Sequence, residues 1–569
     1  MTQTLPPDLE RAPFDLLVIG AGVNGAGIAR DAAMRGLHTL LVDKGDIAGG
    51  TSSWSSRLIH GGLRYLEHGE LHLVRESLRE RERLLRNAPH LVKPLPMIIP
   101  IYAGNRRRPA VIRAGLTLYD ILSFDKSLPR HRIWSKRQTL REAPGLNDEG
   151  LLGAALYYDA QATFAERLSV ENAISARQHG ATVLTYCRVE NLIHTGDHVT
   201  GATLKGVFAG DRLQVAARCV INVAGPWVDQ VLAGVKDLPR LIGGTKGSHL
   251  VVDPFPGAPD AALHTEARAD GRPILIIPWN GRYLIGSTDI RYDGDLDAVR
   301  TDAGEIDYLL AKLNDVIPGA HVGPADVHYA YAGVRPLPYQ PAGSEAGISR
   351  AHAVIDHGPS HRGLLSITGG KLTTYRALAE HAVDAAFRQL GQKPPPCQTD
   401  RVPLPGASGI ALPAFRHHVL ASSGLPAATA NRLLDIYGAR ASEVVALGER
   451  DARLLEPLCA GCNAIAAEVV FAFEEELAQT VEDVLLRRTM IGLNPDLGLG
   501  ADRAVAAVAE RHLGWTAVRA HTEVAAYRAH IARFKPLGWH PPQDREPEST
   551  SPEHRQKSPS PAAVGEGLG

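Results

Sequence analysis

The sequence predicts an α/β fold that begins with a βαβ unit and ends in a helical domain. A glycine-rich turn at 20–25 lies between a short apolar strand and a helix, and the acidic residue Asp43 ends the next strand. The segment 411–536 has helical spacing throughout, and it follows a Pro-rich stretch at 392–410 that is typical of a linker. We therefore expect nucleotide binding near the N-terminus and a separate helical domain near the C-terminus.

The composition is that of an ordinary globular protein. The 569 residues are 44% hydrophobic and 22% charged, which is enough chain for about two to four domains with large cores. The net charge of -1 lacks the basic excess that is typical of nucleic-acid-binding proteins, so we expect no nucleic-acid partner.

The five cysteines are too few and too scattered for a disulfide framework, which favours a reducing cytoplasm. Cys459 and Cys462 have the CxxC spacing of a zinc or redox pair. No second pair completes a zinc site, so we expect two free thiols and no metal. No apolar run is long enough for a transmembrane helix, and the N-terminus lacks the apolar core of a signal peptide. Attachment to a membrane surface would need neither feature.

The first βαβ unit comprises a strand at 14–19, a helix at 23–35 and a strand at 38–43. In its turn, Gly20 permits the tight bend, Gly22 lets the backbone approach a pyrophosphate, and Gly25 lets the helix lie close to the strand. The helix N-terminus would then bind the phosphates, and Asp43 would bind a ribose hydroxyl. An acid at this position disfavours NADP, but the motif alone does not choose between NAD and FAD.

Further elements follow from hydrophobic periodicity. The stretch 70–90 is predicted to be a solvated amphipathic helix, because charges fill the positions between its leucines. Helices are also expected at 163–180 and 372–390, and strands at 181–225, 245–290 and 327–370. The tail 541–569 is rich in Pro, Ser and Glu, and we expect it to be disordered.

The loop after Asp43 gathers polar groups that could hydrogen-bond a flavin. It contains the hydroxyl cluster Thr51-Ser52-Ser53, then His60-Gly61-Gly62-Leu63 and the pair Arg64-Tyr65. With this loop included, the chain resembles the flavin-dependent glycerol-3-phosphate dehydrogenases of the aerobic, quinone-linked type. The resemblance rests on blocks at 20–36, 51–70, 220–229, 246–252, 278–289, 331–337 and 368–382, with a weaker one at 473–489. The tail after about 540 has no counterpart in that family.

The resemblance implies a glutathione-reductase-like or D-amino-acid-oxidase-like FAD domain with an inserted, mostly antiparallel substrate domain. The FAD domain would comprise 14–95, 160–245 and 345–392; the substrate domain 96–159 and 246–344; and the all-α C-terminal domain 405–540. The implied FAD contacts are Gly20, Ala21, Gly22, Asn24, Gly25, Asp43, Thr51, Ser52, Ser53, His60, Gly61, Gly62, Leu63, Gly225, Gly370, Lys371, Leu372 and Thr373.

The implied activity is oxidation of sn-glycerol 3-phosphate to dihydroxyacetone phosphate, with hydride transfer to FAD. Electrons would pass to a membrane quinone from an enzyme attached peripherally to the inner face of the cell membrane. A homodimer is possible, and the sequence leaves the oligomeric state open.

Two alternative functions share the motifs: a glycerol-3-phosphate oxidase that uses oxygen, and an FAD-dependent amine or amino-acid oxidase. The resemblance implies that oxidases of this kind carry an extra segment in the substrate region. The oxidase is disfavoured because this sequence shows no such segment. A non-catalytic flavoprotein is disfavoured because the pocket residues are all present.

A phosphorylated substrate requires cationic ligands. In their motif context, Arg64, Arg335, Arg350 and Lys371 are the candidates, and Tyr65 would hydrogen-bond the phosphate. Removal of the hydroxyl proton requires a base, for which histidine is suited. His60 and His249 are both candidates, and the choice between them stays open. Arg335 would stabilise the developing alkoxide. The helix after Gly370 would direct its N-terminus at the flavin.

A basic run at 106–108, together with Arg113, precedes the apolar segment 114–124. A solvated charge run is one interpretation. A membrane-surface patch is the other, because anionic lipid attracts basic and apolar side chains together. The quinone-linked resemblance favours the membrane interpretation.

Overall fold

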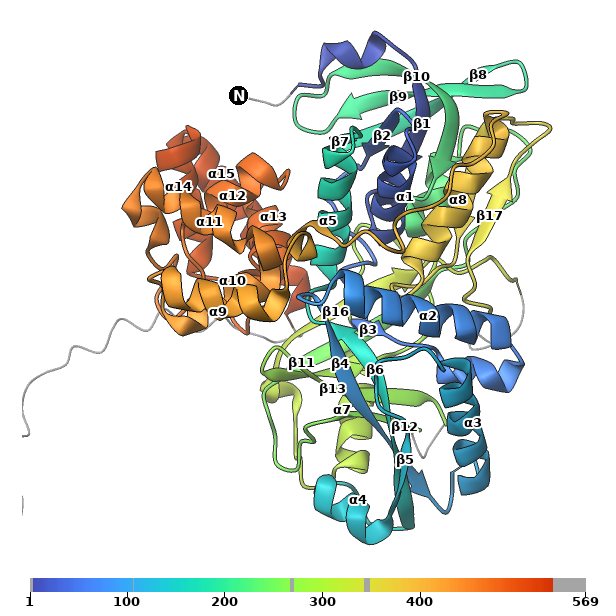
Figure 1. Cartoon of the computed structure of the whole chain (residues 1–569), viewed down its shortest axis with the longest axis vertical. Coiled ribbons are helices and arrows are strands. Elements are labelled where there is room, and N and C mark those ends of the chain that lie inside the picture. The colour runs from blue at the N-terminus through green and yellow to red at the C-terminus, as the bar shows by residue number, and fades with distance from the viewer. Residues whose placement is uncertain (1–3, 106, 267–270, 342–347, 536–569) are drawn as a thin grey trace, which may run out of the picture. The chain divides into compact units, whose positions relative to one another are not determined.

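The computed structural model describes residues 4–105, 107–266, 271–341 and 348–535, except for the side chains of residues 64, 67 and 68. Two sheets organise this part of the chain (Figure 1). The predicted tail at 541–569 lies outside the described residues, so its disorder stays a prediction.

The first sheet is built around parallel strands. Its order is β17 (Ala353–Asp356), β18 (Leu364–Thr368), β10 (Arg212–Asn222), β1 (Phe14–Ile19), β2 (Thr39–Val42) and β7 (Thr182–Leu184). All neighbours run parallel except β17, which is antiparallel to β18. The predicted strands at 14–19 and 38–43 are confirmed. The strands read as continuous apolar runs because both faces of the sheet are covered.

Helices α1 (Val23–Met34), α5 (Ala165–Gln178) and α8 (Tyr375–Gln389) share one apolar core with one face of this sheet. The other face is covered by α6 (Val228–Val231) and by the hairpin β8 (Cys187–Thr195) and β9 (His198–Gly206), which continues from β10. This arrangement places the first turn of α1 at the carboxyl end of β1, the edge where nucleotides bind in such sheets.

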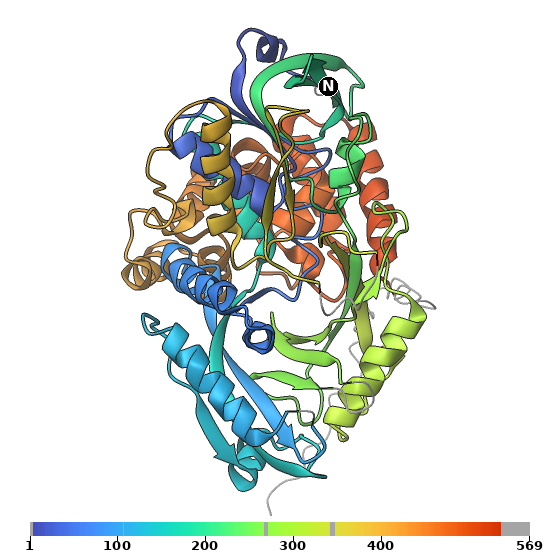
Figure 2. The same cartoon turned by 90° about the vertical axis from the view of Figure 1, so that its right-hand side faces the viewer.

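The second sheet is mostly antiparallel (Figure 2). Its order is β15 (Ile290–Arg291), β11 (Thr245–Val252), β14 (Arg282–Gly286), β13 (Pro273–Trp279), β12 (Ala262–Glu266), β4 (Val92–Tyr102), β6 (Leu151–Ala162) and β3 (Leu58–Ile59), with β16 (Val327–Arg335) beside β11 and β5 (Arg132–Ser135) beside β6. Helix α7 (Ala303–Val316) packs on one face, and α3 (Pro109–Leu122) packs on the other. Helix α4 (Lys136–Glu142) follows β5.

Helix α2 (Leu71–Asn87) is not the solvated helix that its charge pattern predicts. It contacts α8 on the first sheet and strands β4 and β6 of the second sheet, and half of its charged residues are buried. Arg81 pairs with Asp159 on β6 at 2.5 Å, and Glu80 pairs with Arg376 on α8 at 2.6 Å. The prediction fails because a charge run looks the same in sequence whether its partners are water or distant side chains.

The segment beyond the linker is helical, as predicted. Its helices are α9 (Leu412–Ser422), α10 (Ala427–Tyr437), α11 (Ala441–Ala446), α12 (Ala467–Glu475), α13 (Val481–Asp483), α14 (Ala501–Leu513) and α15 (Ala517–Ile531). Buried ion pairs link this segment to the elements of the first sheet. Arg167 on α5 pairs with Glu476, and Asp46 after β2 pairs with Arg487 and Arg488.

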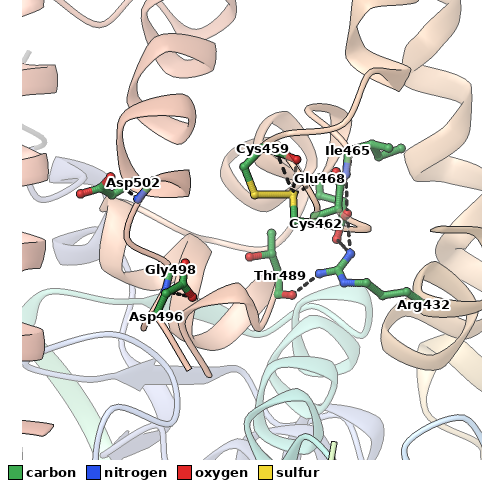
Figure 3. Close-up of a disulfide and its surroundings, with 11 residues drawn as sticks. Arg432, Cys459, Cys462, Ile465, Glu468, Thr489, Asp496, Gly498 and Asp502 are labelled. Carbon is green, nitrogen blue, oxygen red and sulfur yellow. Dashed lines mark hydrogen bonds and ion pairs between the residues drawn. A yellow bond between two sulfur atoms is a disulfide. The ribbon is translucent and has the colours of Figure 1, made fainter. Parts of the chain in front are cut away.

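The structure corrects the prediction of two free thiols at Cys459 and Cys462, because it joins them in a disulfide (Figure 3). The chain reverses direction here, with the Leu458 N–H donating to the Ala464 carbonyl, and this brings the two cysteine Cα atoms within 5.5 Å. Cys187, Cys219 and Cys397 remain free.

Candidate active site

A single cavity of about 1240 Å³ begins at the carboxyl ends of β1 and β2 and extends to strands of the second sheet. It brings together most of the residues that the sequence singles out. Those lining it are Gly20, Gly22, Asn24, Asp43, Thr51, Ser52, His60, Leu63, Tyr65, Gly225, His249, Arg335, Arg350, Gly370, Lys371, Leu372 and Thr373. Segments that are distant in sequence therefore meet around one space.

Five of the predicted cofactor contacts do not line this cavity: Ala21, Gly25, Ser53, Gly61 and Gly62. They support its wall instead. The Ser53 hydroxyl donates to the Ala48 carbonyl at 2.6 Å, and the Gly61 N–H donates to the Tyr119 hydroxyl at 2.8 Å. The Arg64 side chain lies outside the described part of the chain, so its predicted phosphate contact stays a prediction.

The glycine turn has the geometry that its spacing predicts. Gly20 has φ +110°, a conformation that side chains disfavour, and an added Cβ would come within 2.8 Å of the Val223 carbonyl oxygen. A Cβ at Gly25 would overlap the Gly20 carbonyl, so helix α1 lies directly against the turn. The helix N-terminus consequently faces the cavity, where its dipole and free N–H groups favour phosphate.

Asp43 stands beside this turn. Its Oδ2 accepts the Ala21 N–H at 2.6 Å, and its Oδ1 accepts the Gly45 N–H at 2.8 Å. Burial raises the pKa of Asp43, while these two backbone N–H groups partly offset the effect. A carboxylate has about four lone-pair sites, so two remain for ribose hydroxyls.

One further polar atom in this region lacks a partner. The side-chain oxygen of Asn24 is buried and accepts no hydrogen bond from the described residues. A Cβ at Gly370 would lie 3.0 Å from the Asn24 amide nitrogen, so glycine is what leaves this space open. An acceptor that is buried without a donor is costly, so the site suits a ligand that carries hydroxyl or N–H groups.

Two arginines converge on one carboxylate at the other end of the cavity. Arg335 Nη1 donates to Asp289 Oδ1 at 3.0 Å, and Arg350 Nη2 donates to Asp289 Oδ2 at 3.1 Å. Arg335 Nη2 also donates to the Ser287 hydroxyl at 2.8 Å. The predicted cations are therefore brought together, by an acidic residue that the sequence analysis did not single out.

Lys371 lies nearby on the α8 side of the cavity. Its ammonium group donates to the Ser77 hydroxyl at 3.0 Å and sits 4.0 Å from the centre of the Tyr65 ring. Burial lowers the pKa of Lys371 to about 7; Glu76 counters this effect, while Arg350 adds to it. The lysine therefore changes charge near neutral pH, and an anionic ligand would favour its protonated form.

His249 is buried on β11, and its ring stacks on Tyr331 with centroids 5.1 Å apart. Its Nε2 shares a 2.8 Å hydrogen bond with the Ser56 hydroxyl, and its Nδ1 has no partner among the described residues. Burial, together with the positive charges of Arg335 and Arg57, lowers the pKa of His249 to about 3. The imidazole is therefore neutral at physiological pH.

His60, the other candidate base, occupies a different wall. Its backbone N–H donates to the Thr373 hydroxyl at 3.1 Å, which ties the 51–62 loop to the start of α8. The structure thus places both histidines on the cavity and leaves both roles as predictions.

The helical C-terminal segment also reaches the cavity, which sequence reasoning missed. Arg487, His530 and Phe534 are among the lining residues, and the Phe534 ring lies 4.7 Å from the ring of Trp54. No local pattern around these residues marks them as part of a site. Among the described residues, no group of three or more His, Cys, Asp or Glu side chains is placed to hold a metal ion.

Comparison with known proteins gives two family matches. Residues 15–376 match the model described as FAD dependent oxidoreductase, and residues 397–520 match the C-terminal domain of alpha-glycerophosphate oxidase. The glycerol-3-phosphate dehydrogenase of Synechocystis sp. is 45% identical over 92% of this chain and 97% of its own length. Glycerol-3-phosphate dehydrogenase 2 of Mycobacterium tuberculosis is 39% identical over 91% and 88%.

Solved structures agree. The glycerol-3-phosphate dehydrogenase from Bacillus halodurans, complexed with FAD, has a TM-score of 0.75 at 29% identity and covers 94% of this chain and 97% of its own. The L-alpha-glycerophosphate oxidase from Mycoplasma pneumoniae, with FAD bound, has a TM-score of 0.53 at 18% identity and covers 69% and 99%. The second likeness concerns the fold alone.

Proposed function

The chain belongs to the FAD-dependent glycerol-3-phosphate dehydrogenase family, and we propose from this membership that it oxidises glycerol 3-phosphate to dihydroxyacetone phosphate. The observation that carries the proposal is the set of three cations, Arg335, Arg350 and Lys371, on the cavity that begins at the nucleotide turn. A phosphate dianion needs several donors with positive charge, whereas a carboxylate substrate typically needs one arginine.

The residues present fit FAD. The glycine turn and the α1 N-terminus would hold the pyrophosphate, Asp43 would hold the ribose, and the unpartnered Asn24 oxygen would accept a donor from the cofactor. When bound, FAD supplies the acceptor for the hydride that leaves the carbinol carbon.

The protein groups handle the proton and the charge. We assign the base to His249, because its imidazole lies on the cavity with Arg335 and is neutral at working pH. A bound phosphate dianion would offset the positive charge of Arg335 and so raise the pKa of His249 towards the useful range. Arg335 would stabilise the alkoxide that develops as the proton leaves.

The test is an anaerobic titration of the purified flavoprotein. Glycerol 3-phosphate should bleach the flavin absorbance, and glycerol, which lacks the phosphate, should not. A flavin that stays oxidised with glycerol 3-phosphate but is reduced by an amino acid would contradict the proposed substrate.

We further propose that the electrons pass to a membrane quinone. The curated relatives are named dehydrogenases, which favours an acceptor other than oxygen. A soluble quinone analogue should reoxidise the bleached enzyme rapidly. One hydrogen peroxide per turnover in air, at a comparable rate, would instead favour the oxidase.

A quinone acceptor requires contact with a membrane, and α3 carries a suitable surface. Three of its large apolar side chains point into solvent: Val111 is 56% exposed, Ile121 is 62% exposed, and Phe124 just beyond the helix is 79% exposed. Arg108 and Arg113 are exposed beside them. No helix in the described part of the chain is long and apolar enough to cross a membrane.

Of the predicted basic run at 106–108, we assign only Arg108 to this surface. Arg107 pairs with Glu266, and Arg106 lies outside the described residues. Apolar side chains rimmed by the remaining arginines still fit an anionic bilayer surface. We propose that this α3 surface attaches the enzyme peripherally to the inner face of the cell membrane.

Vesicle flotation tests the attachment. The pair Ile121→Ser and Phe124→Ser, and separately the pair Arg108→Glu and Arg113→Glu, should release the enzyme from vesicles containing phosphatidylglycerol. Val518→Ser is the matched control, because Val518 is 77% exposed on α15, away from this surface. Unchanged flotation of both pairs would exclude α3 as the docking surface.

A further inference from the structure

The Asp289 carboxylate lies between two cations that come from different parts of the chain. Asp289 follows β14; Arg335 ends β16, 46 residues later, and Arg350 follows 61 residues after Asp289. Each carboxylate oxygen accepts one N–H from a different guanidinium group, at 3.0 and 3.1 Å.

This bridging changes what the two arginines can do. Guanidinium groups repel one another at short range, and a carboxylate placed between them offsets that repulsion. Each guanidinium has five N–H donors in a rigid fork, so holding Asp289 leaves other donors for a ligand. The Nε of Arg350 is buried and has no hydrogen-bond partner among the described residues, so it is a donor that an oxyanion would satisfy.

The loop that carries Asp289 is itself anchored. The Thr288 hydroxyl donates to Glu305 Oε1 on α7 at 2.6 Å and accepts the Ser248 N–H of β11 at 2.9 Å. Glu305 is 3% exposed and also accepts the Ser248 hydroxyl at 2.9 Å and the Lys246 ammonium at 2.7 Å. A buried carboxylate with several donors holds its partners in one arrangement. Asp289 is therefore presented from a fixed position.

Strand β11, which lies beneath Arg335, also helps to fix the position of its side chain. A Cβ at Gly247 of β11 would overlap the Arg335 guanidinium, so glycine lets that group lie flat across the strand. Arg335 is thus fixed from below by close packing and at its tip by Asp289 and Ser287.

We propose that Asp289 is a positioning residue that holds Arg335 and Arg350 together as one clamp for the substrate phosphate. Asp289 acts through the arginines, because its own negative charge repels a phosphate. The inference rests on the proposed function for the identity of the phosphorylated substrate. The clamp itself is an arrangement of three side chains that any small phosphate would probe.

The test uses the FAD-bound Asp289→Asn enzyme, which keeps the size of the side chain and removes its charge. KM for glycerol 3-phosphate should rise about tenfold or more, and this rise should exceed the fall in kcat, because binding is lost before chemistry. The dissociation constant for inorganic phosphate, read from its perturbation of the flavin absorbance, should rise by a similar factor. Asp289→Glu should recover part of both losses. Asp293→Asn is the matched control, since Asp293 pairs with Arg240 on an exposed surface and should leave both constants unchanged.

Wild-type affinity for inorganic phosphate in Asp289→Asn would overturn the proposal, as would a loss confined to kcat. If Asp289→Asn does not retain flavin, Asp289→Ser decides, because serine also removes the charge: a flavin-bound Asp289→Ser enzyme with wild-type KM and phosphate affinity would equally overturn the proposal. Failure of the proposed function looks different. Wild-type flavin that glycerol 3-phosphate does not reduce, but that phosphate perturbs in an Asp289-dependent way, would reject the substrate and keep the clamp.

Discussion

Asp46→Asn would remove the buried carboxylate that ties the helical C-terminal segment to the loop after β2. Arg487 Nε donates to Asp46 Oδ2 at 2.6 Å, and Arg488 donates to both oxygens at 2.8 and 2.9 Å. None of the three side chains is more than 2% exposed. Removing one partner of a buried ion pair costs about 3–5 kcal/mol, because the other charge is left buried.

The surroundings place the expected loss near the lower end of that range. Arg487 keeps Asp483 at 2.8 Å and Glu482 at 3.0 Å, and Arg488 keeps the Glu476 carbonyl at 2.9 Å. We therefore expect the free energy of unfolding to fall by about 3 kcal/mol, or roughly 150-fold in the unfolding equilibrium.

The pH dependence of this loss has a definite sign. Burial opposes ionisation of Asp46, but the guanidinium groups of Arg488 and Arg487 outweigh it and hold the pKa of Asp46 below its usual value. A carboxylate whose pKa is lowered in the folded state stabilises the fold at pH values above its unfolded-state pKa of about 3.9. This stabilisation is lost as the pH falls through the folded-state pKa. The difference between wild type and Asp46→Asn should be full at pH 7 and shrink below about pH 4.

Urea unfolding of the flavoprotein, followed by circular dichroism and by release of flavin fluorescence, measures the loss. Asp125→Asn is the control, because it removes a carboxylate from a solvent-exposed pair with Arg75 and should cost less than about 1 kcal/mol. An Asp46→Asn loss no larger than that of the control would refute the reasoning.

Three predictions concern the reaction. Because burial lowers the pKa of Lys371 to about 7, the lysine loses its charge as pH rises past neutrality, so KM for glycerol 3-phosphate should increase above pH 7. Lys371→Arg should remove that increase in steady-state kinetics, and an unchanged profile would exclude Lys371 as its source. His249→Gln should slow anaerobic flavin reduction by about 10²–10⁴-fold in stopped flow if His249 is the base; a loss below tenfold would return the role to His60. Gly247→Ala should displace Arg335 and raise KM without changing any charge, whereas Gly319→Ala, where an added Cβ meets open space, should bind substrate normally. Equal effects of the two alanines would contradict the packing argument.

Much of the nucleotide site was readable from local pattern. The Gly20 turn and the end of β2 at Asp43 depend on backbone sterics and on residues that are neighbours in the chain, so spacing alone placed them. The motif context predicted the cations. It could not predict how Arg335 and Arg350 are arranged, because Asp289 joins side chains that are 46 and 61 residues away from it in the sequence.

The sequence by itself determined the βαβ unit, the helical C-terminal segment and the family, because short-range periodicity and contiguous motifs encode each of them. Only the tertiary structure decided which charges are buried. The sequence predicted solvated charges on α2, but Arg81 pairs with the buried Asp159 in the structure. Nothing in the sequence near Arg487 and Arg488 predicted their pairing with Asp46. The physical reason is that burial and ionic pairing depend on which distant segments pack together, and charged residues look alike in sequence whether water or a remote carboxylate surrounds them.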